Sequence, residues 1–374
     1  MFDVAQKKNL TGMNLPQLQE FVGTLGEPTF RGKQVFDWLY TKGASSFNEM
    51  TSLSKAFRSK LEDVAIVRRL RLADAQESRL DGTIKLLFEL SDGNRIESVL
   101  IPSEPADEGE AASTLTRKRP RRTLCVSTQI GCPLDCAFCA TASMGFVRNL
   151  TAGEIVDQIL EARRLSRQRI TNLVYMGMGE PLMNYDNLMQ SIDIVTTGMG
   201  MSARRITVST AGWADRIRRM ADEGRKVKLA VSLHALDPRV RTDLMPINRK
   251  FPLERLLDAI EYYYRKTKQR VTYEYIPFDG VNDSKEDADR LAKLAGRVPC
   301  KVNIVPFHTI GFTQPRGFAA SLKPASPQRF NAFIERLRTA HVTVIVRSNA
   351  GEDIEAACGQ LAVLYPTRSR IAFA

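Results

Sequence analysis

The chain has 374 residues, of which 43% are hydrophobic, 26% are charged and 7% are aromatic. These values supply enough apolar residues for one large core or two modest ones, which excludes a disordered or fibrous protein. The 54 Lys and Arg residues exceed the 42 Asp and Glu residues, so the net charge is +12. An excess of this size favours a polyanionic partner such as nucleic acid, although it also serves solubility alone.

No apolar run approaches the length of about 20 residues that a membrane span needs. The opening stretch, MFDVAQKKNLTGMNLPQLQE, has no apolar core like that of a signal peptide. We therefore expect a cytoplasmic protein without a membrane partner, whose thiols stay reduced. Three of the six cysteines fall within eight residues, which in a reducing compartment favours metal or redox chemistry over a disulfide scaffold.

Residues 1–65 are expected to form a small basic helical domain. Apolar residues recur there at helical spacing, and basic residues are interleaved with them. RNA binding is one use for such a surface, and a merely solvated helical face is the alternative. The apolar set is Leu15, Leu18, Phe21, Val22, Val35, Phe36 and Leu39, and the basic set is Arg31, Lys33, Lys42, Lys55, Arg58 and Lys60.

Residues 66–122 are expected to form a β-hairpin extension followed by a polar linker. Two β-type runs flank the sequence Ser-Asp-Gly-Asn at 91–94, which is typical of a hairpin turn. The stretch 103–122 has an acidic half, a basic half and no periodicity, as expected of a linker.

Residues 123–374 alternate between strand and helix patterns. A capping box of Thr151 and Glu154 begins one of the helices. The alternation predicts a parallel sheet with helices outside it, either a barrel or a doubly wound sheet. No GxGxxG follows the first strand, which disfavours dinucleotide binding. The expected strands are Leu124–Thr128, Leu173–Met176, Ile206–Ser209, Leu229–Leu233, Val271–Ile276, Val302–Val305 and Val342–Val346.

Chemically distinctive residues stand where these strands end. CPLDCAFC follows the first strand, GMGEP follows the second, and STAG, SLHA and PFH end the third, fourth and sixth. NAGEDIEAACG follows the seventh strand. In a parallel barrel all of these points lie on one rim, where ligands bind.

The most specific motif is Cys132-x3-Cys136-x2-Cys139. Three thiolates on one short loop suit an iron–sulfur cluster or a zinc ion. No fourth cysteine is nearby, so one metal position would stay open for a ligand. The alternative is a structural zinc site completed by His234 or His308.

The CxxxCxxC spacing resembles the signature of the radical S-adenosylmethionine (SAM) enzymes. The resemblance implies one 4Fe–4S cluster held by Cys132, Cys136 and Cys139, with SAM bound to the remaining iron through its methionyl amine and carboxylate. It also implies a partial (β/α)6 barrel. GMGEP is similar to the glycine-rich segment of these enzymes, in which Gly179 and Glu180 would meet the methionyl amine.

The resemblance is closer still to the RlmN-type dual-specificity RNA methyltransferases. Seven motifs occur in order between residues 30 and 361. The family methylates carbon 2 of adenine in 23S ribosomal RNA and in certain transfer RNAs, and radical SAM enzymes commonly take electrons from flavodoxin or ferredoxin. The motifs are FRGKQVFDWLY, IESVLIP, LCVSTQIGCPLDCAFCATASMGF, YMGMGEPLMN, SLHA, MPINRK and DIEAACGQL.

The resemblance implies a reaction that runs through the protein and uses two SAM molecules per turnover. One SAM methylates Cys358, and a second is cleaved to a 5′-deoxyadenosyl radical that takes a hydrogen atom from the new methyl group. The resulting methylene radical adds to carbon 2 of adenine. Glu97 is the implied base that removes the carbon-2 proton. Cys125 then attacks the sulfur of Cys358, so that a disulfide forms and the methylated RNA leaves.

Further positions match the SAM pocket of the family: Ser209, Ser232, Leu233 and His234. Ser and His side chains can hydrogen-bond ribose and carboxylate groups, although a structural histidine is the common alternative. After the sixth strand, His308 stands where we expect an asparagine of the SAM pocket, which marks a divergent member. Both side chains can donate and accept hydrogen bonds, so His308 is assigned to SAM binding. Cys300 matches no motif and is assigned to packing.

Two alternative functions stay open. A homologous enzyme type methylates carbon 8 of the same ribosomal adenine and also uses paired cysteines, so the cysteines do not separate the two reactions. A non-enzymatic RNA-binding protein with a structural zinc at the three clustered cysteines is the alternative from another class.

Overall fold

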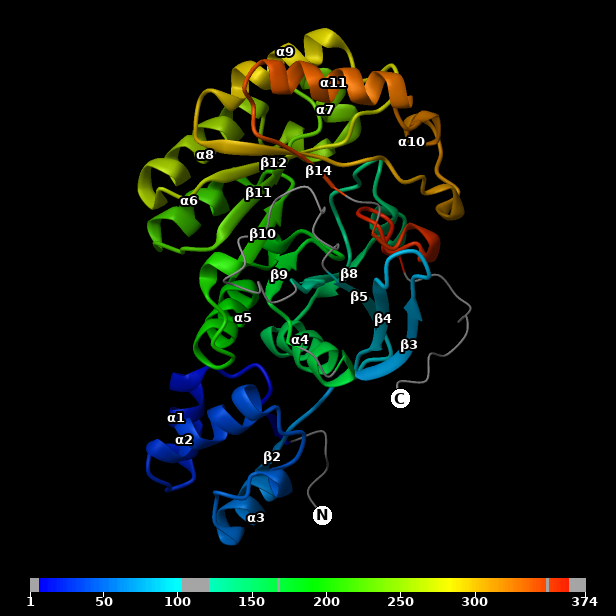
Figure 1. Ribbon diagram of the computed structural model, residues 1–374. Helices are drawn as coiled ribbons and strands as arrows, with labels where there is room; N and C mark the ends of the chain where they lie inside the picture. The colour runs from blue at the N-terminus through cyan, green and yellow to red at the C-terminus, as the bar shows by residue number, and fades with distance from the viewer. Residues whose placement is uncertain (1–6, 103–120, 167–168, 348–349, 363–374) are drawn as a thin grey trace, which may run out of the picture.

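The computed structural model describes residues 7–102, 121–166, 169–347 and 350–362. Its centre is a ten-stranded sheet with the order β14-β13-β12-β11-β10-β9-β6-β5-β4-β3 within the described residues (Figure 1). The strands from β6 to β14 in this sheet run parallel, and β5, β4 and β3 continue it antiparallel. Its strands are β3 (Arg71–Glu77), β4 (Ile84–Glu89), β5 (Arg95–Ile101), β6 (Thr123–Cys125), β9 (Asn172–Tyr175), β10 (Ile206–Thr210), β11 (Lys228–Ser232), β12 (Val271–Tyr275), β13 (Cys300–Ile304) and β14 (Val344–Val346).

Helices follow the parallel strands and cover the outside of the curved sheet (Figure 1). The predicted partial (β/α)6 barrel is thereby confirmed. None of the described helices has the length and apolar character to cross a membrane. The helices of this core are α4 (Ala152–Ser166), α5 (Tyr185–Thr197), α6 (Ala214–Asp222), α7 (Pro238–Leu244), α8 (Leu253–Thr267), α9 (Lys285–Ala295), α10 (Phe318–Ser321) and α11 (Pro327–Thr339).

The expected capping box begins helix α4. The backbone N–H of Glu154 donates to Thr151 Oγ1 at 3.2 Å, and the backbone N–H of Thr151 donates to Glu154 Oε2 at 2.8 Å. Each side chain therefore satisfies an N–H group that the first helical turn leaves without a partner.

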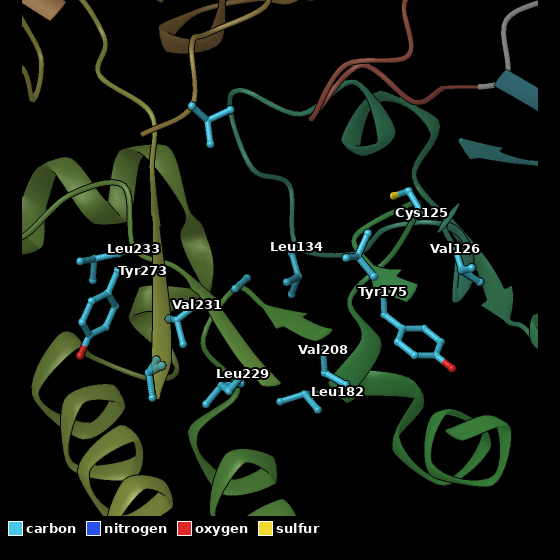
Figure 2. Packing of buried hydrophobic residues seen from close by; sticks show 14 of the residues in the cluster. Cys125, Val126, Leu134, Tyr175, Leu182, Val208, Leu229, Val231, Leu233 and Tyr273 are labelled. Carbon is cyan, nitrogen blue, oxygen red and sulfur yellow. The ribbon is translucent and has the colours of Figure 1, made fainter. Parts of the chain in front are cut away.

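Side chains alternate along the parallel strands between the helices and the barrel interior. Val208, Leu229 and Val231 are fully buried on the side that packs against helices (Figure 2). Their neighbours Thr207 and Lys228 line an interior cavity instead. The apolar layer thus stabilises the sheet, and polar residues are left for the interior.

All seven predicted strands are present, with shifted ends. The first ends at Cys125 rather than at Thr128, because the following residues bond to the loop after β9. The hairpin turn joins β4 to β5 as predicted, and Leu90 N donates to Asn94 O at 2.8 Å. Strand β3 was not predicted, and neither was the short hairpin of β7 (Gln129–Gly131) and β8 (Phe146–Asn149) around the cluster motif. The short parallel strand pair beside the N-terminal helices was also not predicted. The predicted linker lies outside the described residues, apart from its last two.

The N-terminal helices have a hydrophobic core of their own. They are α1 (Leu15–Thr24), α2 (Phe30–Phe36) and α3 (Lys55–Val64), and strands β1 (Lys8–Asn9) and β2 (Ala65–Ile66) pair in parallel beside them. This core extends onto Val156 and Leu160 of α4 and Ile194 of α5 (Figure 1). A nearly buried ion pair, Arg69 Nη1 to Asp157 Oδ1 at 2.8 Å, joins the same two parts.

Two glycines meet where the N-terminal part touches helix α4. Gly12 has a φ of +100°, a conformation that side chains disfavour. A Cβ on Gly153 would overlap the carbonyl oxygen of Thr11. The close approach of these two backbones therefore depends on the absence of a side chain.

We expect Gly153→Ala to lower the free energy of unfolding by about 1–3 kcal/mol, since overpacking a tight contact has costs of that size. Chemical denaturation of the full chain measures the change. Gly23→Ala is the matched control, because no atom lies within 4 Å of a Cβ there. It replaces a helical glycine and should stabilise by up to about 1 kcal/mol. Equal stability of the two variants would contradict this packing argument.

Candidate active site

The three clustered cysteines lie on the loop between β7 and β8. The hairpin closes tightly beneath them, since Cys132 N donates to Gly145 O at 2.8 Å and a Cβ on Gly131 would overlap the same carbonyl. Cys132, Cys136 and Cys139 all line one cavity at the carboxyl ends of the parallel strands. The predicted motif is thus brought together on one wall of a pocket.

The donor set fits a 4Fe–4S cluster better than a single ion. Burial raises the pKa of all three thiols, to about 12 for Cys132, so bound metal would be needed to hold them as thiolates. In a cluster each thiolate binds a different iron, so the sulfurs need not converge on one point. No three His, Cys, Asp or Glu side chains of the described residues form a group suited to one metal ion, as a structural zinc would require.

Residues of the GMGEP segment line the same cavity as the three cysteines. Gly179 has a φ of +99°, and a Cβ there would overlap the Gln129 side chain. Glu180 is buried and accepts from Leu182 N at 3.0 Å and from Ala211 N at 2.8 Å. Burial raises the pKa of Glu180 to about 7. Its carboxyl group is therefore held in one orientation at the ends of β9 and β10, where it can accept from an ammonium group.

Ser209, Ser232 and His234 line the same cavity, as predicted for the SAM pocket. Nδ1 of His234 accepts from Ile276 N at 3.2 Å, and burial lowers the pKa of the ring to about 3, so it is neutral. The neutral ring then carries its proton on Nε2 and can donate from there.

A buried guanidinium that was not predicted holds this part of the rim. Arg241 is 1% exposed and donates to the carbonyl of Leu233 and, at 2.9 Å, to that of Ala211. Leu233, predicted beside SAM, contributes this carbonyl and is not among the residues around the cavity. Arg241 thereby ties the ends of β10 and β11 together.

His308 lies in a different place from the one expected. It lines a neighbouring cavity of about 490 Å³ inside the barrel rather than the cavity around the three cysteines. Its Nδ1 is 3.3 Å from Glu352 Oε1 of the C-terminal segment. His308 therefore contacts the C-terminal segment that carries Cys358.

Cys125 and Cys358 both line the interior cavity, and Cys358 also lines the cavity around the cluster cysteines. Both are free thiols, Cys125 buried and Cys358 exposed. Burial, with a smaller contribution from the charge of Cys358, raises the pKa of Cys125 to about 12. Cys358 therefore stands at the junction of the two cavities.

Hydrogen bonds hold the segment around Cys358 from two sides. On one side, Ala140 N donates to Gly359 O at 2.7 Å and Thr141 Oγ1 donates to Leu361 O at 2.6 Å. On the other, Gly351 N donates to the Asp81 carboxylate at 2.9 Å. Figure 1 shows this red segment beside β3 and β4. The segment thus bridges the cluster loop and the antiparallel extension.

Arg347 is the functional candidate that the sequence patterns did not reveal. Its Nη1 lies 3.7 Å from Cys358 Sγ, 3.7 Å from Met176 Sδ and 3.9 Å from Glu274 Oε2. A guanidinium at this distance can donate to the sulfur of Cys358 and hold it in place. Glu274 is buried, and burial raises its pKa. In the sequence, only position could have indicated these two residues: Glu274 lies at an inward position of β12, and Arg347 directly follows β14.

Glu97 lies on β5, one strand away from Cys125. It faces the same side of the sheet as Val99, whose register partner is Cys125, but it is not among the residues that line the cavity. Burial raises the pKa of Glu97 to about 7, although Lys85 Nζ is 3.6 Å away. Cys300 packs in the main core, as expected.

Comparisons with known proteins agree with this architecture. Residues 8–67 match a family described as the ribosomal RNA large subunit methyltransferase N-terminal domain, and residues 126–294 match the radical SAM superfamily. A solved radical SAM methyltransferase from Sphaerobacter thermophilus is 40% identical, with a TM-score of 0.83 over 95% of this chain and 99% of that one.

Two curated relatives match over nearly their whole lengths. A probable dual-specificity RNA methyltransferase RlmN from Flavobacterium psychrophilum is 43% identical over 96% of this chain and 98% of its own. A dual-specificity RNA methyltransferase RlmN from Syntrophobacter fumaroxidans is 44% identical over 94% and 97%. The chain therefore belongs to the RlmN family of radical SAM enzymes and is an RNA methyltransferase.

Proposed function

We propose that this enzyme methylates carbon 2 of adenine in 23S ribosomal RNA and in transfer RNA, with Cys358 as the carrier of the one-carbon unit. The observation that carries the proposal is the position of Cys358, which lines both the cavity around the cluster cysteines and the interior cavity that holds Cys125. A carrier must reach SAM on one side and the RNA base on the other. The target adenine must be unstacked to enter.

The residues that line the cavity around the cluster cysteines have separate proposed roles. A 4Fe–4S cluster held by Cys132, Cys136 and Cys139, when bound, supplies the electron that turns SAM into a radical source. Glu180 and the backbone at Gly179 orient the methionyl amine. Two SAM molecules are used per turnover, and a flavodoxin or ferredoxin supplies the electrons.

The interior cavity would complete the reaction. Arg347 positions the sulfur of Cys358 through its Nη1 at 3.7 Å, and the thiolate of Cys358 is the form that accepts a methyl group. Glu97 takes the proton from carbon 2 of the RNA-bound intermediate. The thiolate of Cys125 then attacks the sulfur of Cys358, the bond from that sulfur to the transferred carbon breaks, and its electron pair stays with the RNA, whose new methyl group takes up a proton. A transient disulfide between the two cysteines remains. Residues 1–65 act as a basic RNA-binding domain beside the barrel of residues 123–374, and the proposed setting is the cytoplasm.

The modified nucleoside separates this proposal from carbon-8 methylation. We expect 2-methyladenosine in nuclease digests of RNA treated with the enzyme, SAM and reductant, measured by mass spectrometry. Protein purified without oxygen should contain iron and sulfide, and replacing Cys136 by Ala should remove both. A product of 8-methyladenosine alone, or stoichiometric zinc in place of iron, would overturn the proposal.

Replacing Cys358 by Ala should abolish RNA methylation and leave the iron content unchanged, because the carrier sulfur is lost and the cluster ligands remain. Nucleoside analysis and iron determination on the same preparation measure both effects. Cys300→Ala is the matched control, since its thiol belongs to the packed core. Methylated RNA produced by the Cys358 variant would refute the carrier role.

Cys125→Ala should stop the reaction at a covalent adduct of protein and RNA, because no thiol remains to attack the sulfur of Cys358. A denaturing gel should show a slower band that ribonuclease removes. Cys300→Ala should give no such band. Free methylated RNA at the wild-type rate would show that Cys125 does not resolve an adduct.

Removal of the carbon-2 proton should accelerate with rising pH up to about 7 and then level off. Glu97 accepts a proton only as a carboxylate, and burial raises its pKa to about 7. Lys85 and Glu355 are the charged groups that act on it, with opposite effects. Single-turnover rates across pH measure the profile.

Glu97→Gln should slow this step by about 10²–10⁴-fold and remove the rise with pH. Glu77→Gln, which changes an exposed carboxylate on β3, should retain the wild-type profile. An unchanged profile in the Glu97 variant would assign the proton transfer to another group.

A further inference from the structure

A group of cations lines the interior cavity at the end of the strands opposite the cysteine loop. Arg121 precedes β6, Lys228 begins β11, and Lys301 lies near the start of β13. All three line the same cavity as Cys125 and Cys358. Neither the SAM pocket nor the paired cysteines give these cations a task.

The strand register places Lys228 in line with Cys125. Cys125 pairs with Val174, Val174 with Thr207, and Thr207 with Lys228, and all four line the cavity. Neighbouring strands lie about 4.8 Å apart, so three strand spacings, about 14 Å along the curved sheet, separate the two backbones. The side chain of Lys228 extends into the cavity, so its ammonium group lies closer to Cys125 than the two backbones do. The remaining distance is comparable to the length of one nucleotide.

The strand register also places Lys301 on the inner face of the sheet, two strands away from Lys228. Lys301 pairs with Thr272, and Thr272 pairs with Ala230, which is two residues beyond Lys228. Positions two apart on a strand face the same side. The two lysines are therefore neighbours on the inner face of the sheet.

The buried carboxylate of Glu274 lines the same cavity and attracts Lys301, but it makes no direct ion pair with these cations. No hydrogen bond or ion pair of the described chain involves the side chains of Arg121, Lys228 or Lys301. Burial lowers the pKa of Lys228, and the charges of Arg121 and Arg205 lower it further. Burial also lowers the pKa of Lys301, with Lys228 as the next cause. Such a cluster creates a positive potential inside a concave site, which attracts anions.

We propose that Lys228, Lys301 and Arg121 bind the backbone phosphates next to the target adenosine and thereby set how far the base enters the barrel. The proposal rests on the proposed function and adds a phosphate site to it. The cavity of about 490 Å³ lies within the range of nucleotide-sized ligand sites. Phosphate contacts fix the register of a nucleic acid, and the base is read elsewhere.

The test compares the double variant Lys228→Gln/Lys301→Gln with Lys293→Gln, which removes one positive charge from the exposed side of α9. The probe is an RNA hairpin that wild-type enzyme methylates. We expect the double variant to bind it at least about tenfold more weakly. The slope of log K against log salt should fall by about 0.7 for each lost single-strand phosphate contact. Lys293→Gln should change neither the RNA affinity nor the salt dependence by these amounts.

A second RNA identifies the partner group. Neutral methylphosphonates replace the phosphates that flank the target adenosine. We expect this RNA to bind wild-type enzyme about tenfold more weakly and to bind the double variant with little further loss, because the same contacts are already gone. Lys228→Arg, which keeps the positive charge, should retain most of the wild-type affinity for unmodified RNA.

Two results would overturn the phosphate site. The first is a double variant that binds RNA and depends on salt as Lys293→Gln does. The second is an equal further loss for the methylphosphonate RNA in the variant and in wild-type enzyme. Thermal unfolding and iron content confirm that the variant is folded. If wild-type enzyme itself fails to methylate the hairpin, the proposed function fails, which is a separate outcome.

Discussion

The position of one sulfur depends on two hydrogen bonds between the C-terminal segment and the cluster loop. Ala140 and Thr141 follow the last cysteine of the motif, and they donate to the carbonyls of Gly359 and Leu361, which come directly after Cys358 in the chain. The segment has little regular structure, so its backbone groups take their partners from neighbouring elements. The loop that carries three thiols therefore also determines where the fourth one stands.

The open sheet gives this arrangement its interior. A closed parallel barrel fills its centre with layers of apolar side chains. Here the antiparallel strands β5, β4 and β3 extend the sheet beyond β6, and the inner face retains a cavity. Outward positions such as Val208 and Val231 supply the packing (Figure 2). The inward positions are therefore free to carry Cys125, Glu274 and Lys228.

Sequence patterns predicted the parts of this structure that depend on local periodicity. The alternating core, the α4 cap and the hairpin before residue 102 follow from spacing alone, and the cluster loop follows from its motif. Strand β3 was not predicted because polar and apolar residues alternate only weakly along Arg71–Glu77, and its pairing is interrupted by a bulge after Leu72. Arg347 and Arg241 escaped because a single polar residue beside a strand has no pattern of its own. Their contacts arise only when distant strands align, as does the placement of His308 beside Glu352.

Buried carboxyl groups lie toward the carboxyl ends of the strands, together with the guanidiniums of Arg241 and Arg347, and Lys228 and Lys301 lie toward the amino ends. At the carboxyl ends, burial raises the pKa of Glu180 and Glu274, so a cationic ligand that enters this region stabilises their carboxylates. The sulfonium of SAM is such a ligand. At the amino ends Lys228 and Lys301 are depressed in pKa by burial and by like charge, and they gain when an anion enters. A methyl donor that is cationic and an acceptor that is anionic would each relieve the unfavourable charge at one end. The reacting groups would then meet between them, where Cys358 stands.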